Sequence, residues 1–316
     1  MRIVIALADD AVQKRGAGAG TNKEAEILRA AAEQLARVAD GNDLVVVQAQ
    51  GHPLWPAPEY DHGAYAMNGF AHDLLATDAD HAIACRLDLE LRHRLPSTRA
   101  CSTLFSMVEV DMADPAFDHP DMPIGAVFTG QRALACAQQK RWRIAHDGVG
   151  YRRVVPSPRP KRLLQLAALR GFVDQGAVVM CTLGSIPVVS SAADGGWHGV
   201  EAVIDPYVGA AFVAQEIGAD QFVIATDVAG VFLDWGTANS KLLRHGHPSA
   251  VREFAAEAGS MGPKLQAASG FAERTGARAA IGALADVARL VDGTAGTTIS
   301  CERVDPCRFA GGAVAR

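Results

Sequence analysis

A glycine-containing turn ahead of a lysine is the part of the sequence best suited to binding an anion. Gly259-Ser-Met-Gly-Pro263 precedes Lys264, and a helix is predicted over 265–275. Free amide groups at the beginning of a helix attract anions, and a lysine adds a positive charge there. The turn and its lysine therefore suit a phosphate group. The alternative is that Lys264 is a solvated helix residue.

A second polar pair closes a predicted strand. The apolar run Gln221–Thr226 is typical of a buried strand, and Asp227 follows it directly. Ligands of open α/β folds usually bind outside the carboxyl ends of parallel strands. We therefore expect Thr226 and Asp227 near a ligand, unless Asp227 only caps a helix.

The segment Tyr151–Arg162 concentrates positive charge on a stiff backbone. It contains four arginines, Lys161 and three prolines. Proline restricts the backbone, and arginine presents a planar fork to phosphates or carboxylates. Two interpretations remain open: a rigid cationic arm over a ligand, or a tether held by arginine–carboxylate pairs.

The elements that position these residues alternate along the chain. Apolar runs predict strands at Arg2–Ala8, Asp43–Val47, Gly176–Met180, Gln221–Thr226, Arg278–Ile281 and Thr297–Ile299, and helical periodicity predicts helices at Asn22–Ala39, Val208–Ile217, Ala250–Glu257, Leu265–Thr275 and Ala283–Val291. This order favours an α/β fold: a three-layer αβα sandwich with a mainly parallel sheet, forming a single domain over 1–316. Residues 111–162 hold six of the 15 prolines and are expected to form an irregular insertion or a small protruding subdomain.

Composition narrows the classes of partner. The net charge is −5 and basic residues do not cluster into a long run, so neither nucleic acid nor a membrane surface is an expected partner. Apolar runs of 18 residues, which a membrane span needs, are absent from the sequence. The six cysteines include no C-x-x-C pair, so no metal site is expected, and reduced thiols suit a cytoplasmic protein. A small-molecule ligand is the expected partner.

Several segments together resemble the carbamate kinases of the amino acid kinase family. They are Tyr151–Arg162, Gly199-Val-Glu-Ala-Val-Ile-Asp205, Thr226-Asp-Val-Ala-Gly-Val-Phe-Leu-Asp-Trp-Gly236, Gly259–Lys264, Ala279-Ala-Ile-Gly282, and Asp114-Pro-Ala-Phe117 with Pro123-Ile-Gly125. The resemblance implies the amino acid kinase fold and a homodimer. It also implies reversible transfer of the γ-phosphoryl group of ATP to carbamate, with ADP and Mg²⁺.

The same resemblance implies a nucleotide site in the second half of the chain. Lys264 is similar to the lysine that meets the transferred phosphate in the family. The residues expected to contact nucleotide are Thr226, Asp227, Gly230, Trp235, Met261, Gly262, Pro263, Lys264 and Lys161.

The loops expected at the phosphoryl and acyl end depart from the family pattern. A Gly-Gly-Asn turn after the first strand is replaced by Ala8-Asp9-Asp10. A carboxylate near a phosphate repels it by about 4 kcal/mol per charge pair at ~4 Å and an effective dielectric near 20. The alternative is that Asp9 and Asp10 hold Mg²⁺, which prefers oxygen ligands.

Further departures remove glycines and lysines. A Gly-Asn-Gly-Pro-Gln loop is replaced by Ala49-Gln-Gly-His-Pro53, and a glycine run before Ile-Pro is replaced by Thr182-Leu-Gly-Ser185. Asp121-Met122 stands for Thr-Lys, and Asp205-Pro-Tyr207 for Asp-Lys-Asp. Positive charge around the transferring phosphoryl group is a main source of catalysis. We therefore predict kinase activity that is absent or severely reduced.

Three functions remain open. The first is a weak carbamate kinase that uses Lys264. The second is a non-catalytic nucleotide-binding subunit, beside a carbamoyl-transferring enzyme. The third is an enzyme of changed chemistry on a carbamoyl- or ureido-like molecule, in which a cysteine beside a histidine is a candidate nucleophile pair. For the rebuilt end, the candidate catalytic residues are Asp9, Asp10 and His52, and the expected pocket residues are Gly51, His52, Cys181, Thr182, Gly184 and Ser185.

Overall fold

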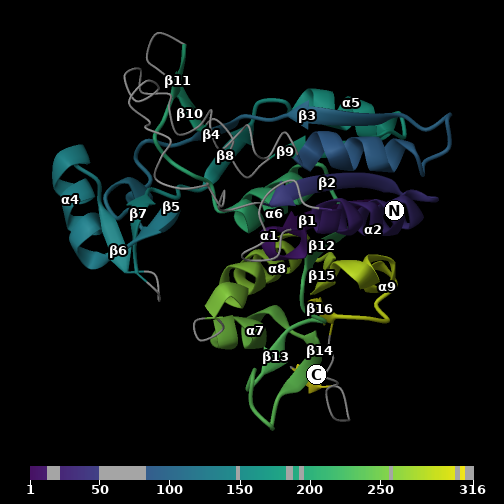
Figure 1. The fold of residues 1–316 in the computed structure, drawn as a ribbon. Coiled ribbons are helices and arrows are strands. Elements are labelled where there is room, and N and C mark those ends of the chain that lie inside the picture. Colours follow the sequence, from purple (N-terminus) through teal and green to yellow (C-terminus); the bar gives the residue numbers. More distant parts are fainter. Residues whose placement is uncertain are drawn as a thin grey trace.

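The computed structural model describes residues 1–12, 22–49, 83–146, 150–182, 188–191, 196–255, 259–302 and 307–309. Its centre is a mostly parallel sheet in the order β13-β14-β16-β15-β12-β1-β2-β9-β3 (Figure 1). The strands are β1 (Arg2–Ala8), β2 (Asp43–Ala49), β3 (Cys101–Phe105), β9 (Val178–Thr182), β12 (Gln221–Thr226), β13 (Phe232–Leu233), β14 (Lys241–Gly246), β15 (Arg278–Ala283) and β16 (Thr297–Ile299), with β17 (Cys307–Phe309) beside β14.

Helices cover both faces of this sheet. They are α1 (Asp9–Val12), α2 (Asn22–Ala39), a helix over 83–92, α5 (Leu166–Asp174), α6 (Pro206–Glu216), α7 (Pro248–Ala255), α8 (Gly262–Thr275) and α9 (Val287–Val291), with 3₁₀ turns η2 (Pro115–Phe117), η3 (Gly259–Met261) and η4 (Leu284–Asp286). None of the helices in the described parts of the chain is long and apolar enough to cross a bilayer.

Two apolar cores lie on the two sides of the sheet, because side chains alternate in direction along a strand. Ile3 and Ile5 of β1 pack with α2, the 83–92 helix and α9. Val4 and Ala6 pack with α5, α6 and α8 on the other face. This arrangement confirms the predicted three-layer αβα sandwich.

The strongest apolar patterns gave element bounds that the structure reproduces. β1, α2, β12 and β16 have the predicted bounds. By contrast, β9 ends two residues later than predicted, at Thr182, and the predicted helix 283–291 is split into η4 and α9. The apolar pattern does not mark such ends, since a strand continues for as long as its neighbours offer hydrogen-bond partners.

The segment 111–162 is more regular than its sequence suggests. It contains β5 (Met122–Phe128), α4 (Gly130–Lys140), β6 (Ile144–His146), β7 (Tyr151–Val155) and the beginning of β8 (Pro160–Leu163). β5, β7 and β6 form an antiparallel sheet, and β8 joins β4 (Val108–Val110), β10 (Val188–Ser191) and β11 (Trp197–Gly199) in another. Antiparallel strands with one face towards solvent need fewer apolar positions, which explains the weak sequence signal.

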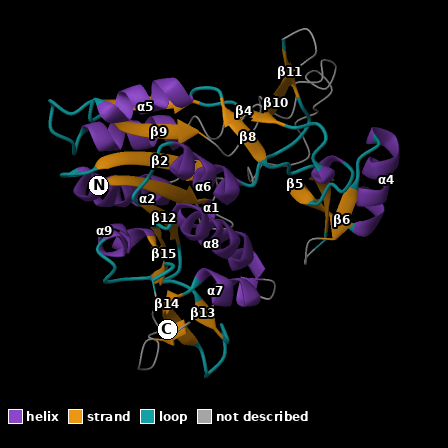
Figure 2. Cartoon of the chain, turned by 180° about the vertical axis from the view of Figure 1, so that it is seen from behind, coloured by secondary structure: helices purple, strands orange, loops and turns teal. Residues whose placement is uncertain are grey.

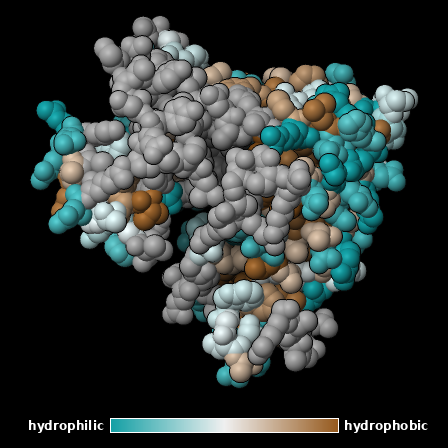
Figure 3. Space-filling model, viewed as in Figure 1, coloured by the Kyte–Doolittle hydropathy of each residue, from teal (hydrophilic) through white to brown (hydrophobic). Residues whose placement is uncertain are grey.

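The β5–β7 sheet and α4 lie apart from the main sheet in both ribbon views (Figures 1 and 2). The space-filling view shows apolar side chains on this outlying part, whereas hydrophilic side chains dominate the opposite flank (Figure 3). Val127 of β5 and Leu134 of α4 are among the exposed large apolar residues. Whether this part is a separate subdomain stays a prediction.

Candidate active site

Asp10, Thr226 and Lys264 meet at the carboxyl edge of the main sheet. The Lys264 ammonium donates to Oδ2 of Asp10 at 2.9 Å, and the Thr226 hydroxyl donates to Oδ1 at 2.9 Å. Lys264 is 3% exposed, whereas the Asp10 side chain is 28% exposed. The Asp10 carboxylate thus binds both the buried Lys264 ammonium and the Thr226 hydroxyl at this edge of the sheet.

The local sequence explains why Lys264 is buried at this place. Gly262 lets the beginning of α8 approach α7, since a Cβ on Gly262 would lie 2.5 Å from the Ala255 carbonyl oxygen. Pro263 occupies the first turn of α8, where a missing N–H costs least. Met261, at the N-cap, provides no side-chain hydrogen bond. The first turn of α8 therefore keeps amide groups that suit an anion beside Lys264.

Tyr207 provides a second contact to the lysine. The Lys264 nitrogen lies 5.0 Å from the centre of the Tyr207 ring, within the range of a cation–π interaction. Tyr207 stands where the family resemblance implies a carboxylate. An aromatic face attracts a cation more weakly than a carboxylate does, so Asp10 becomes the anion that balances Lys264.

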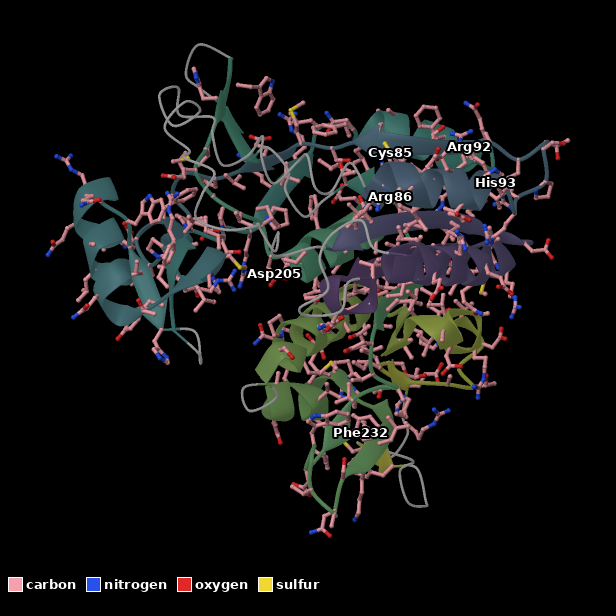
Figure 4. All side chains as sticks on the ribbon, viewed as in Figure 1. Cys85, Arg86, Arg92, His93, Asp205 and Phe232 are labelled. Carbon is pink, nitrogen blue, oxygen red and sulfur yellow. The ribbon has the colours of Figure 1, made fainter. Side chains whose placement is uncertain are left out.

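Asp205 begins the same helix as Tyr207. Its carboxylate accepts from the amides of Tyr207 and Val208, both at 2.9 Å, and so caps α6. Burial raises the pKa of Asp205, against the opposing effects of these two amides and of the Lys264 charge. Figure 4 places Asp205 at the end of α6 that faces the β5–β7 sheet. Asp205 therefore has a structural role as the N-cap of α6.

Two carboxylates near Thr226, those of Asp227 and Asp10, are candidate ligands for the Mg²⁺ of a magnesium–nucleotide complex. Asp227 is exposed, and its Oδ1 lies 3.4 Å from the Thr226 hydroxyl. Mg²⁺ commonly uses one carboxylate together with substrate phosphates, and Asp227 fits that use. Asp10 fits it poorly, because its Oδ2 accepts from the Lys264 ammonium, which repels a divalent cation, and its Oδ1 accepts from the Thr226 hydroxyl. The Asp9 side chain lies outside the described residues.

The cationic segment 151–162 pairs with carboxylates of the protein itself. Glu109 of β4 accepts from Arg162 at 2.7 Å and lies 3.5 Å from Lys161. Arg153 pairs with Glu201. Lys161, expected at the nucleotide, is more than half exposed and turned towards Glu109. These contacts favour the interpretation of the segment as a tether.

The tether makes a pH-dependent contribution to stability. Burial of Glu109 opposes its ionisation, but Arg162 and Lys161 outweigh this effect and hold the pKa of Glu109 below its usual value of about 4.5. Because the folded-state pKa is lowered, this stabilisation is present above about pH 4.5 and is lost as the pH falls through the folded-state pKa.

We expect Glu109→Gln to lower Tm by about 2–4 °C near pH 7, because it removes the charge that Arg162 and Lys161 share. The difference from the unmodified protein should shrink as the pH is lowered from about 5 to about 3, measured by scanning fluorimetry. Glu302→Gln, at an exposed carboxylate, serves as control. An equal difference at both pH values would contradict the assignment.

Two residues expected at the nucleotide have packing roles in the structure. Gly230 packs closely against β14 and β16. A Cβ added to Gly230 would lie 2.9 Å from the Thr297 hydroxyl. Trp235 is 64% exposed and packs on Phe232, with ring centroids 4.9 Å apart. Figure 4 shows Phe232 on the β13–β14 hairpin, in a different part of the molecule from Asp205. Contact of Trp235 with nucleotide stays a prediction.

The rebuilt acyl end is described only in part. Cys181 is fully buried in the apolar core, and this burial raises the pKa of its thiol to about 12. A protonated thiol is a poor nucleophile, so the structure gives no support to catalysis by Cys181. Thr182 ends β9 and is 7% exposed. Gly51, His52, Gly184 and Ser185 lie outside the described residues.

Sequence reasoning missed two side chains at this edge. In the sequence Tyr207 is visible only as the loss of a carboxylate, and the apolar pattern does not single out Gln48, the penultimate residue of β2. Gln48 is 1% exposed, and neither polar atom of its carboxamide has a hydrogen-bond partner among the described residues. A glutamine at the carboxyl end of an apolar strand was the signal available.

Comparisons with known proteins agree with this architecture. The sequence pattern of the amino acid kinase family matches residues 1–283. The chain is 39% identical to a carbamate kinase of Haemophilus influenzae, over 95% of this chain and 97% of the relative, and 37% identical to a carbamate kinase of Rhizobium meliloti, over 95% and 93%.

Among solved structures, carbamate kinase from Giardia lamblia bound to AMP-PNP superposes with a TM-score of 0.78 at 25% identity, covering 95% of this chain and 98% of that protein. This likeness extends over nearly the whole chain, as do the two sequence matches. The chain therefore belongs to the amino acid kinase family and is a relative of the carbamate kinases.

Proposed function

We propose that the chain binds a nucleotide and transfers a phosphoryl group between carbamoyl phosphate and ADP, at a rate that Asp10 keeps low. The observation that supports this proposal is that the Asp10 carboxylate accepts hydrogen bonds from both Lys264 and Thr226. Phosphoryl transfer depends on positioned cations and amide donors around the phosphate oxygens. In this structure the buried Lys264 ammonium is already paired with the Asp10 carboxylate.

In the proposed reaction, a terminal phosphate oxygen of ADP attacks the phosphorus of carbamoyl phosphate. The bond between that phosphorus and the carbamoyl oxygen breaks, and carbamate leaves with the bonding electrons. The first turn of α8 and Lys264 would receive the phosphate charge, and Asp227 would hold the Mg²⁺ that accompanies the nucleotide. Mg²⁺ supplies neutralisation of phosphate charge.

The rate of phosphoryl transfer is expected to be low because Asp10 and the transferring phosphate compete for the Lys264 ammonium. Lys264 can stabilise the transferring phosphate only when its contact with Asp10 weakens, and that contact is worth several kcal/mol at the dielectric of a partly buried site. If the Lys264–Asp10 ion pair never breaks, it favours a second candidate function, that of a non-catalytic nucleotide-binding subunit.

We expect ADP with Mg²⁺ to raise Tm, and ATP to form from ADP and carbamoyl phosphate at less than about 10 s⁻¹, the median for enzymes. Scanning fluorimetry and a coupled ATP assay measure the two effects. Stabilisation without turnover would assign the protein to the second function. A Tm that ADP leaves unchanged would overturn both.

A further inference from the structure

Both oxygens of the Asp10 carboxylate are engaged by donors of the candidate active site. Oδ2 accepts from the Lys264 ammonium at 2.9 Å, and Oδ1 accepts from the Thr226 hydroxyl at 2.9 Å. The oxygens of a phosphate group accept from ammonium and hydroxyl donors in the same way. Asp10 therefore takes up, from within the chain, donors that a bound phosphate would use.

The chain holds Asp10 at this position. α1 follows β1 directly, and its last two residues, Ala11 and Val12, are 9% and 1% exposed in the apolar core on the α2 face. Thr226 is 1% exposed at the end of β12, the strand that pairs with β1. Because the backbone around it is anchored, moving the Asp10 carboxylate away requires rotation of the side chain and loss of both hydrogen bonds.

The proposed reaction defines which nucleotide meets this carboxylate. The phosphoryl group that is transferred lies against Lys264 and the first turn of α8, and in ATP that group is the third phosphate. ADP lacks it, so ADP can bind while Lys264 stays paired with Asp10. ATP brings a phosphate to an ammonium that a carboxylate already holds.

Two effects oppose the third phosphate. It competes with Asp10 for an ammonium that is 3% exposed. It also lies beside the negative charge of Asp10, and repulsion between charges at a partly buried site is screened less than in water. The phosphates of ADP lie farther from Asp10 in this arrangement, and Coulomb repulsion weakens with distance.

We propose that the site selects ADP over ATP, and that the Asp10 carboxylate determines this preference. The proposal rests on the function proposed above and names the nucleotide that the site takes. Mg²⁺ accompanies both nucleotides, so it does not account for the difference between them. After transfer, the same carboxylate weakens the binding of the ATP that has formed and so favours its release.

The test compares ADP with AMP-PNP, an ATP analogue, each with Mg²⁺ and without an acyl substrate. Isothermal titration calorimetry measures the two Kd values and needs no turnover. We expect the unmodified protein to bind ADP at least about tenfold more tightly than AMP-PNP. Tenfold corresponds to about 1.4 kcal/mol, a fraction of the interaction of a charge pair at this range. In Asp10→Asn the Kd for AMP-PNP should fall about tenfold or more, and the Kd for ADP should change by less than about threefold.

Asp174→Asn is the matched control, because it also removes one carboxylate charge from an ion pair. Asp174 accepts from Arg2 at 2.6 Å, and Arg2 begins β1 at the opposite, amino edge of the sheet. This variant should keep the preference for ADP. Loss of the preference in Asp174→Asn would show that it reflects total charge and would overturn the assignment to Asp10.

The comparison in the unmodified protein can overturn the proposal without any variant. Equal binding of the two nucleotides, or tighter binding of AMP-PNP, would do so and would leave the proposed function standing. A preference that survives in Asp10→Asn would overturn the role of Asp10, and weaker binding of AMP-PNP to this variant would indicate a Mg²⁺ ligand instead. Failure of ADP to bind would overturn the proposed function together with the preference.

Discussion

Asp10→Asn should raise the rate of ATP formation from ADP and carbamoyl phosphate by about tenfold or more. The substitution removes the negative charge that balances Lys264 but keeps one acceptor oxygen for the Lys264 ammonium, while the new amide nitrogen can donate to the Thr226 hydroxyl. A gain of 1.4 kcal/mol in stabilisation of the transferring phosphate gives a factor of about ten, a fraction of the interaction of a charge pair at this range. A coupled assay with saturating ADP and Mg²⁺ measures the change.

The same substitution should cost stability. Lys264 is almost fully buried, and loss of its counterion leaves a buried charge whose other contacts among the described residues are the Tyr207 ring and the Ser260 carbonyl. We expect about 1–3 kcal/mol lower unfolding free energy, less than for a fully buried pair because Asp10 is partly exposed. A lower rate in Asp10→Asn would contradict the proposal and would support Asp10 as a Mg²⁺ ligand instead.

Lys264→Ala should abolish detectable phosphoryl transfer, a loss of about 10³-fold or more wherever the basal rate allows it to be measured. The buried ammonium lies in the first turn of α8 and shares the Asp10 carboxylate with the Thr226 hydroxyl. Its removal takes away charge stabilisation in the transition state, whereas ADP binding should weaken much less. Lys241→Ala, at an exposed lysine of β14, is the control and should keep the rate.

The double variant separates direct from indirect effects. If Asp10 lowers the rate through Lys264, the gain from Asp10→Asn should vanish in the Lys264→Ala background, and the two effects should be strongly non-additive. Additive effects in the coupled assay would show that Asp10 acts on the phosphate by itself.

The sequence alone determined the framework of this protein. The apolar runs of β1 and β12 and the periodicity of α2 define elements whose bounds the structure reproduces. Such patterns are decisive because a strand buried on both faces tolerates no polar residue within it. The turn before Lys264 and the polar end of β12 also predict, without any structure, that the carboxyl edge of the sheet carries the chemistry.

Only the tertiary structure decided how that chemistry is arranged. Asp10 and Lys264 are 254 positions apart, and the adverse effect expected of Asp10 on a phosphate takes the specific form of an ion pair with the lysine. Gln48 and Gln221 look alike in sequence, yet among the described residues Gln221 has two hydrogen-bond partners and Gln48 has none. Hydrogen-bond partners from distant segments are set by strand register and helix packing, which local pattern does not encode.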